Sequence, residues 1–180
     1  MHFFKHLKTI NRHKRMVMVH CFKCGLIWQG LLHDLSKYSP TEFINGAKYY
    51  AGIHSPHFNE RKDKGYSDAW MHHKGRNKHH PEYWTDYNME LKRYAPVKMP
   101  DKYLAEMICD RVAASKNYNW GHFTPDIPLN YFISKNDASV MHPETAKATE
   151  MLLRMYAEKG EKETFKYIKE NLVKKKGKKR

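Results

Sequence analysis

The chain contains the stretch Gly30-Leu31-Leu32-His33-Asp34-Leu35-Ser36-Lys37, in which an adjacent His-Asp pair is flanked by leucines. The leucines belong in a helical core, and they draw the two polar side chains toward the interior. Burying an imidazole and a carboxylate without partners would be costly. A metal ion removes this cost, because both groups are good ligands and the cation balances the carboxylate's charge. The alternative is a His-Asp hydrogen bond at the surface, at the end of a helix.

Further candidate ligands lie on both sides of this stretch. His20 lies among apolar residues, and an antiparallel packing of two helices would place it opposite His33, although a core histidine would fit the same pattern. Asp110 shares one helical face with Tyr103 and Met107, so a second carboxylate lies on a mainly apolar face. The sequence therefore predicts a buried polar cluster between separate helices.

Histidine is unusually frequent, with 13 in the chain. Six fall within residues 54–80, namely His54, His57, His72, His73, His79 and His80. A solvated turn would explain any one of the last four, but it is a poor explanation for all of them. They are candidate metal ligands.

The order of elements indicates an all-α protein, since neither a βαβ alternation nor an internal repeat is present. We predict one helix, or two broken at Gly25, over residues 16–35, and a capping box at Ser39-Pro40-Thr41-Glu42 that opens a helix to about Tyr50. Further helices are predicted over residues 67–73, 99–118, 142–159 and 161–174. Residues 52–65 and 119–141 are predicted to be irregular.

Length and composition favour a globular fold. A chain of 180 residues favours one domain, predicted over 1–173 and followed by a basic flexible tail at 174–180. Hydrophobic residues make up 41% and aromatics 13%, which excludes a disordered chain. The chain has no apolar run of about 20 residues and its first residues do not form a signal peptide, so we expect a soluble, cytoplasmic protein with no membrane partner.

The positive charge is concentrated at the two ends of the chain. Of the net charge of +14, the tail supplies six and residues 5–15 supply five, which leaves +3 for residues 17–173. A surface that binds nucleic acid along its length would spread this charge over the fold. Nucleic acid is therefore a less favoured partner, although the tail could bind a polyanion.

The order of the candidate ligands resembles the HD-domain superfamily of metal-dependent phosphohydrolases, and the extra histidines resemble its two-metal members. More narrowly, five segments resemble a bacterial and phage family of HD-like proteins known by a domain-of-unknown-function label. The segments are Gly30–Lys37, Ser39–Phe43, His73–His80, Met99-Pro100 and Glu106–Asp110. The resemblance covers roughly residues 10–120 and implies a single HD-like helical bundle in which ligands converge from several helices.

The resemblance also implies a ligand set for one or two divalent transition-metal ions (Mn, Fe, Co, Ni or Zn). The expected ligands are His20, His33, Asp34, His73, His79, His80 and Asp110, with Asp34 as the bridging ligand. The gap from His73 to His79 is shorter than the usual separation in two-metal HD enzymes. His54 or His57 is therefore an alternative ligand.

The expected activity is metal-dependent hydrolysis of a nucleotide or another small phosphoester. A bound metal lowers the pKa of coordinated water, and Asp34, Lys37 and Arg76 are the candidate catalytic residues. The two cations would neutralise phosphoryl oxygens, although both could be ordinary surface charges. Aromatic residues that could stack on a nucleobase are Trp70, Tyr83, Trp84, Tyr118 and Trp120.

Two other functions remain open at this point. Some HD-fold proteins hold two irons and carry out oxygenation, and the ligand types do not separate iron from other divalent ions. Alternatively, Cys21 and Cys24 beside His20 could form half of a structural zinc site in a nucleic-acid-binding module, but only Cys109 is left to complete it. An odd number of cysteines without an export signal otherwise indicates three free thiols.

Overall fold

The structure is a computed structural model that describes residues 1–174, and it confirms the all-α prediction. Longer helices are α1 (Phe3–Cys24), α3 (Pro40–Lys48), α4 (Pro56–Lys64), α6 (Asp101–Tyr118), α7 (Ile127–Ser134) and α8 (Pro143–Ile168). Shorter ones are α2 (Ile27–Leu32), η1 (Leu35–Tyr38), α5 (Asp68–Lys74), η2 (Pro81–Tyr83), η3 (Asp137–Val140) and the π-helical turn η4 (Lys169–Val173). Of the predicted tail, Lys174 is exposed, and residues 175–180 lie outside the described residues.

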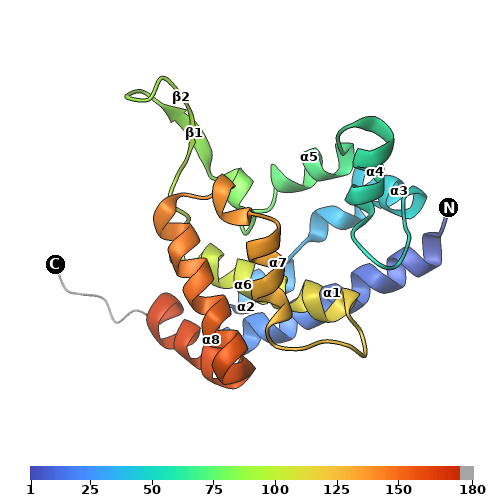
Figure 1. Cartoon of the computed structure of the whole chain (residues 1–180). Coiled ribbons are helices and arrows are strands. Elements are labelled where there is room, and N and C mark those ends of the chain that lie inside the picture. The colour runs from blue at the N-terminus through green and yellow to red at the C-terminus, as the bar shows by residue number, and fades with distance from the viewer. Residues whose placement is uncertain (175–180) are drawn as a thin grey trace.

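Helix α1 connects the two halves of the fold (Figure 1). Helices α3, α4 and α5 gather beside its N-terminal half, whereas α6, α7 and α8 pack around its C-terminal half. The apolar core lies in this second half, where Val17 of α1, Ile108 and Val112 of α6 and Leu152 of α8 are fully buried. This arrangement leaves the N-terminal half of α1 free to contribute polar residues to the space between the two groups of helices.

The predicted break at Gly25 is confirmed. Gly25 adopts a left-handed conformation (φ 81°), and its N–H bonds to the carbonyls of Cys21 and Phe22, which ends α1. The chain then turns back so that α2 packs on α1 at Gly30. A Cβ atom on Gly30 would lie 3.0 Å from the Cys21 Cβ, so only glycine lets the two helices approach this closely.

The His33-Asp34 pair does not lie within a helix, and this part of the prediction was wrong. His33 is the extended residue that ends α2, and Asp34 has a left-handed backbone with φ 54° before the 3₁₀ helix η1 begins. Aspartate tolerates this conformation better than most residues because its short polar side chain can satisfy local groups. Of the predicted capping box, the N-cap half is confirmed, since Ser39 Oγ accepts a hydrogen bond from the Glu42 N–H at the start of α3. The reciprocal half was wrong, because the Ser39 N–H bonds to the Ser36 carbonyl and the Glu42 side chain binds histidines instead.

Several predicted boundaries were also wrong. Helix α1 starts at Phe3 rather than at residue 16, because its buried face contains the histidines His6 and His13 and so lacks an apolar pattern. Residues 52–65 contain α4, a polar helix whose buried positions are only Pro56 and Glu60. Residues 119–141 contain α7.

The C-terminal helices and a hairpin complete the fold. The two predicted C-terminal helices are present as the two parts of α8, which is kinked at Gly160 (φ 76°), and the second part ends at Ile168. An unpredicted antiparallel hairpin, β1 (Thr85–Asn88) and β2 (Arg93–Pro96), projects from the helical body in Figure 1.

Within the described residues, the helices are too short or too polar to cross a bilayer. The prediction of free thiols is confirmed for Cys21, Cys24 and Cys109, all of which are buried.

The close approach at Gly30 leads to a prediction about stability. Gly30→Val should lower the free energy of unfolding by about 1–3 kcal/mol, because the added side chain must separate α1 from α2. Chemical denaturation measures this change. Leu32→Val, at a position that is 59% exposed, introduces the same type of β-branched residue and serves as the control. Equal stability of both variants would show that the α1–α2 contact is not tight.

Candidate metal centre

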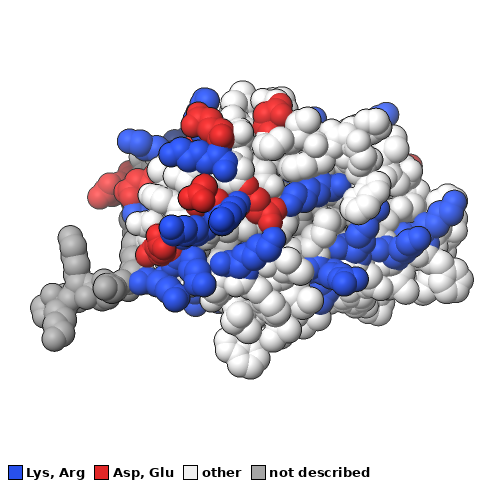
Figure 2. All heavy atoms as spheres, turned by 90° about the horizontal axis from the view of Figure 1, so that it is seen from below, with Lys and Arg blue, Asp and Glu red and all other residues white. Residues whose placement is uncertain are grey.

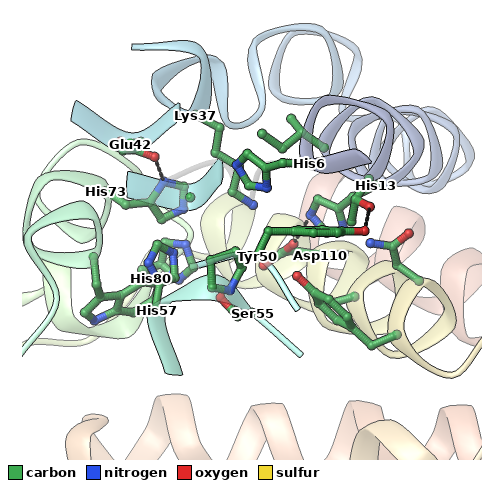
Figure 3. Close-up of a pocket in the computed structure, with 18 residues that line it drawn as sticks. His6, His13, Lys37, Glu42, Tyr50, Ser55, His57, His73, His80 and Asp110 are labelled. Atoms are coloured by element: carbon green, nitrogen blue, oxygen red, sulfur yellow. Dashed lines mark hydrogen bonds and ion pairs between the residues drawn. The ribbon is translucent and has the colours of Figure 1, made fainter. Parts of the chain in front are cut away.

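Seven residues with ligand chemistry meet between the two groups of helices. They come from α1, the turn after α2, α5, the segment before η2, and α6. Figure 3 shows four of them, His13, His73, His80 and Asp110. These residues are His13, His33, Asp34, His73, His79, His80 and Asp110. The convergence of ligands from separate helices is what the sequence led us to expect, with one change in membership.

One group contains His13, His33, Asp34 and Asp110, whose ligand atoms lie within 4.8 Å of one another. His13 Nε2 is 2.9 Å from Asp110 Oδ1. His33 Nε2 is 3.3 Å from Asp34 Oδ2 and 3.5 Å from Asp110 Oδ1. Two imidazole nitrogens and two carboxylate oxygens therefore face a common point, which is a ligand set suited to a divalent transition metal.

A second group contains Asp34, His73, His79 and His80. Asp34 Oδ1 is 3.3 Å from His73 Nε2 and 3.4 Å from His79 Nε2. Because Oδ2 faces the first group and Oδ1 faces the second, Asp34 is shared between them. A bridging carboxylate of this kind is the role that the resemblance implied for Asp34.

The unsatisfied polar atoms of this region provide an independent indication of missing ligands. Six buried nitrogen and oxygen atoms in the two groups have no hydrogen-bond partner. They are the Nε2 atoms of His13, His33, His79 and His80 and both carboxylate oxygens of Asp34. Buried polar atoms are rarely left without partners, because each costs about 1–3 kcal/mol. Cations bound between these atoms would remove that cost.

Two buried glutamates contact the Nδ1 atoms of three histidine rings, on the side that faces away from the centre. Glu106 Oε1 lies 3.0 Å from His33 Nδ1 and 3.2 Å from His79 Nδ1. Glu42 Oε2 lies 2.7 Å from His73 Nδ1. An ionised carboxylate only accepts hydrogen bonds, so the Nδ1 atoms donate and the Nε2 atoms face the centre. Carboxylate–histidine pairs of this kind fix the rings of metal-binding histidines.

These glutamates had no assigned role in the sequence analysis, although both lie in segments that carried the resemblance. Glu106 precedes Asp110 by one helical turn on α6, so the two carboxylates share a face. Glu42 belongs to the capping box of α3, and its side chain is 4% exposed because it points toward His73 instead of solvent. Spacing alone could have indicated the role of Glu106, whereas that of Glu42 depends on how α3 packs against α5.

The charges in the centre favour metal-binding protonation states. Burial opposes ionisation of Asp34 and Asp110, but the charges of His33 and Lys37 for Asp34 and hydrogen bonds from His13 and His33 for Asp110 hold both pKa values well below the usual range. Burial lowers the pKa of His13, and burial together with His79 lowers that of His80. Ionised carboxylates and neutral imidazoles are the forms that bind metal.

His33 differs from these histidines in its protonation. Burial disfavours its charged form, but Asp34, Asp110 and Glu106 outweigh burial and raise the pKa of His33 well above its usual value. Without a metal, a proton on this ring balances the carboxylates. A metal ion that binds His33 must displace that proton, so we expect binding to release protons and to weaken as pH falls.

His20, a predicted ligand, lies outside the metal-capable groups of the described residues, whereas His13 belongs to one of them. His20 Nδ1 lies 3.1 Å from the carbonyl oxygen of Cys109, and its Nε2 lies 3.3 Å from Lys116 Nζ and 3.6 Å from Glu161 Oε2. His13 and His20 are seven residues apart on α1, so they share a face but are separated by about 10.5 Å along the axis. Helical periodicity does not distinguish these two positions.

The structure also distinguishes the alternative candidates, His54 and His57, from the other candidate ligands of the His-rich segment. It brings His73, His79 and His80 into one group, but it leaves out His54 and His57. His54 Nδ1 lies 3.2 Å from the Ser55 carbonyl oxygen. The short gap between His73 and His79 is accommodated because the chain turns after α5, where the Asn77 amide bonds back to the His73 carbonyl.

The two predicted cations lie in different surroundings. Lys37 Nζ is 2.6 Å from Asp34 Oδ2 and lines a cavity beside the centre (Figure 3). Arg76, the other candidate catalytic cation, is exposed, and its guanidinium donates to the His72 carbonyl. Lys37 is thus the cation that the fold places next to the candidate ligands.

The cavity has a volume of about 150 Å³. His13, His73, His80 and Asp110 of the centre line it, so the candidate ligands are reachable from it. Of the aromatic residues considered for stacking, Trp70 and Tyr118 line the cavity, whereas Tyr83, Trp84 and Trp120 do not. Two of the five aromatic candidates are therefore placed to contact a bound ligand.

The zinc-module alternative finds little support in this geometry. Cys24 Sγ and Cys109 Sγ are 3.6 Å apart in the core, and the three cysteines are outside the metal-capable groups of the described residues. Basic side chains do spread over the face in Figure 2, where acidic ones lie mainly to the left and centre. On α1 this charge includes the exposed Lys5, Lys8 and Arg15.

The chain matches a family of unknown function (DUF5662) over residues 2–171, and it therefore belongs to that family. The comparisons with curated proteins and with solved structures gave no match.

Two histidines on the same face of α1 provide a matched test of the centre. His13→Ala should lower the metal content of the protein purified without a His tag by about one ion per chain, because it removes one of four ligands. His20→Ala should leave the content unchanged. Elemental analysis by mass spectrometry measures both variants. Equal metal loss in the two variants would contradict the assignment of His13.

Proposed function

We propose that this protein is a metal-dependent phosphohydrolase with a dinuclear centre, built on an HD-like arrangement of helices. The observation that carries the proposal is the pair of ligand groups that share Asp34, together with the six buried atoms that lack hydrogen bonds. Two cations would satisfy these atoms at once. A single cation would leave the imidazoles of one group without a partner.

The residues fit a pair of divalent transition-metal ions. His13, His33 and Asp110 would hold one ion, His73, His79 and His80 would hold the other, and Asp34 would bridge them. Imidazole and carboxylate ligands suit Mn, Fe, Co, Ni and Zn. When bound, such ions lower the pKa of coordinated water and polarise a phosphoryl oxygen.

The remaining groups of the site have roles that follow from their positions. Glu42 and Glu106 hold three of the imidazole rings in place, so the ligands are oriented before a metal arrives. Lys37 supplies a fixed positive charge where the cavity meets Asp34. Its carboxylate neighbours, Asp34 first, outweigh burial and keep its pKa above the usual value, so it stays protonated. A fixed cation at this position would stabilise charge that develops on phosphoryl oxygens.

The matched cations Lys37 and Arg76 test the hydrolytic role. Lys37→Ala should lower the turnover of a phosphoester by roughly 10²–10³, the usual loss when one preorganised electrostatic group is removed. Arg76→Ala should change turnover by less than about twofold, because its side chain faces solvent. Steady-state kinetics on both variants, with metal content measured in parallel, gives the comparison. A larger loss from Arg76→Ala than from Lys37→Ala would contradict the proposed role of Lys37.

A second experiment separates hydrolysis from oxygenation. The wild-type protein should hydrolyse a phosphoester without oxygen when it is loaded with a redox-inert ion such as Zn²⁺ or Mg²⁺. Asp34→Ala should abolish this activity and lose most of the bound metal while the chain keeps its helical circular dichroism. Turnover that requires both iron and oxygen would overturn the phosphohydrolase proposal and would support the di-iron alternative.

A further inference from the structure

The cavity contains polar groups that the metal centre does not use, and they lie on α1, α6 and the segment after α3. They include Asn117, Tyr50 and His6, and all three line the cavity. From their hydrogen-bonding state we infer that the cavity binds a small hydroxylated phosphate ester, such as a polyol or sugar phosphate, and excludes nucleotides. This inference rests on the proposed function and narrows its substrate class.

Asn117 lines the cavity and holds an unused donor just beneath its surface. Its side-chain oxygen lies 2.5 Å from Arg12 Nε, and its backbone carbonyl accepts from Arg12 Nη2 at 2.8 Å. Arginine only donates hydrogen bonds, so the amide oxygen must face Arg12 and the amide nitrogen must face away from it. This nitrogen is buried without a partner, in a residue that is 3% exposed. A ligand atom that accepts a hydrogen bond would satisfy it.

Tyr50 presents an unused acceptor. Its hydroxyl lies 2.7 Å from Thr9 Oγ1, and Thr9 donates its own proton to the Lys5 carbonyl. Thr9 has only one hydroxyl proton, so Tyr50 must be the donor in the Tyr50–Thr9 hydrogen bond. The Tyr50 oxygen then keeps its lone pairs for a ligand that donates a hydrogen bond.

His6 adds a third group to this part of the cavity. Its ring packs so closely on α3 that a Cβ atom on Gly46 would lie 2.2 Å from His6 Nε2. Its Nδ1 is buried without a partner. The three buried histidines of α1 therefore differ in their surroundings: His6 lines the cavity, His13 belongs to the candidate metal centre and His20 lies in the core.

A donor and an acceptor in one small cavity match the chemistry of a hydroxyl group, which both accepts and donates hydrogen bonds. Among the residues that line the cavity, Lys37 is the one Lys or Arg, which suits a single phosphoryl group better than a polyphosphate. The cavity volume of about 150 Å³ is also below the roughly 300–1,000 Å³ of pockets that enclose drug-sized ligands. A compact alcohol fits these limits, whereas a nucleoside does not.

The experiment compares glycerol 3-phosphate with propyl phosphate, which has the same carbon chain without the hydroxyls, and with adenosine 5′-monophosphate. For the metal-loaded wild-type protein, kcat/KM for glycerol 3-phosphate should exceed that for propyl phosphate by about tenfold or more, because the unpaired polar groups of the cavity disfavour an alkyl chain. Tyr50→Phe and Asn117→Ala should reduce this ratio severalfold by raising KM for glycerol 3-phosphate more than KM for propyl phosphate.

Tyr131→Phe and Asn130→Ala, on the exposed side of α7, are the matched controls and should leave the ratio unchanged. If Asn117→Ala fails to fold, Tyr50→Phe, which removes only one oxygen, still decides the outcome. Equal kcat/KM for glycerol 3-phosphate and propyl phosphate, or faster hydrolysis of adenosine 5′-monophosphate, would overturn the inference and leave the phosphohydrolase proposal standing. If no phosphoester is hydrolysed, that proposal fails. In that case, calorimetry on the metal-loaded protein decides the inference, because glycerol 3-phosphate should bind more tightly than propyl phosphate and adenosine 5′-monophosphate.

Discussion

The buried carboxylate of Asp34 is the constraint on which the rest of this structure depends. It lies between five histidines and a lysine, is 2% exposed, and has its closest charged partner in Lys37, whose Nζ is 2.6 Å from Oδ2. A charge in such a position is stable only when opposite charges surround it. Helices from both halves of the fold contribute the compensating groups. The stability of the buried charge therefore depends on how these helices pack together.

The centre is supported by close backbone packing at two glycines and by two buried glutamates. Gly30 lets α2 approach α1, which places the turn that contains His33 and Asp34 over the N-terminal half of α1. Gly46 lets α3 approach His6 in the same way. Glu42 and Glu106 then fix the rings from α5 and from the segment before η2. The candidate ligands that lie in turns, His33 and His79, are therefore oriented by Glu106 of helix α6.

Helix α1 shows how surroundings assign different roles to the same residue type. His6, His13 and His20 repeat every seven residues along one face of the helix, and all three are buried. His6 meets α3 and the cavity, His13 meets Asp110, and His20 meets the Cys109 carbonyl and Glu161. Burial and the nearby lysines lower the pKa of His20 to about 4, so it remains neutral in the core.

The sequence by itself determined the helical class, the break at Gly25, the N-cap of α3 and five of the residues grouped around Asp34. These features depend on local conformation or on residues whose chemistry is unusual in an apolar context. The tertiary structure was needed to choose His13 over His20 and to place Lys37, and not Arg76, beside the centre. It was also needed to show the roles of Glu42 and Glu106. Helical periodicity specifies a face but not a height along the axis, and only the packing of α2, α5 and α6 against α1 selects which turn of that face meets Asp34.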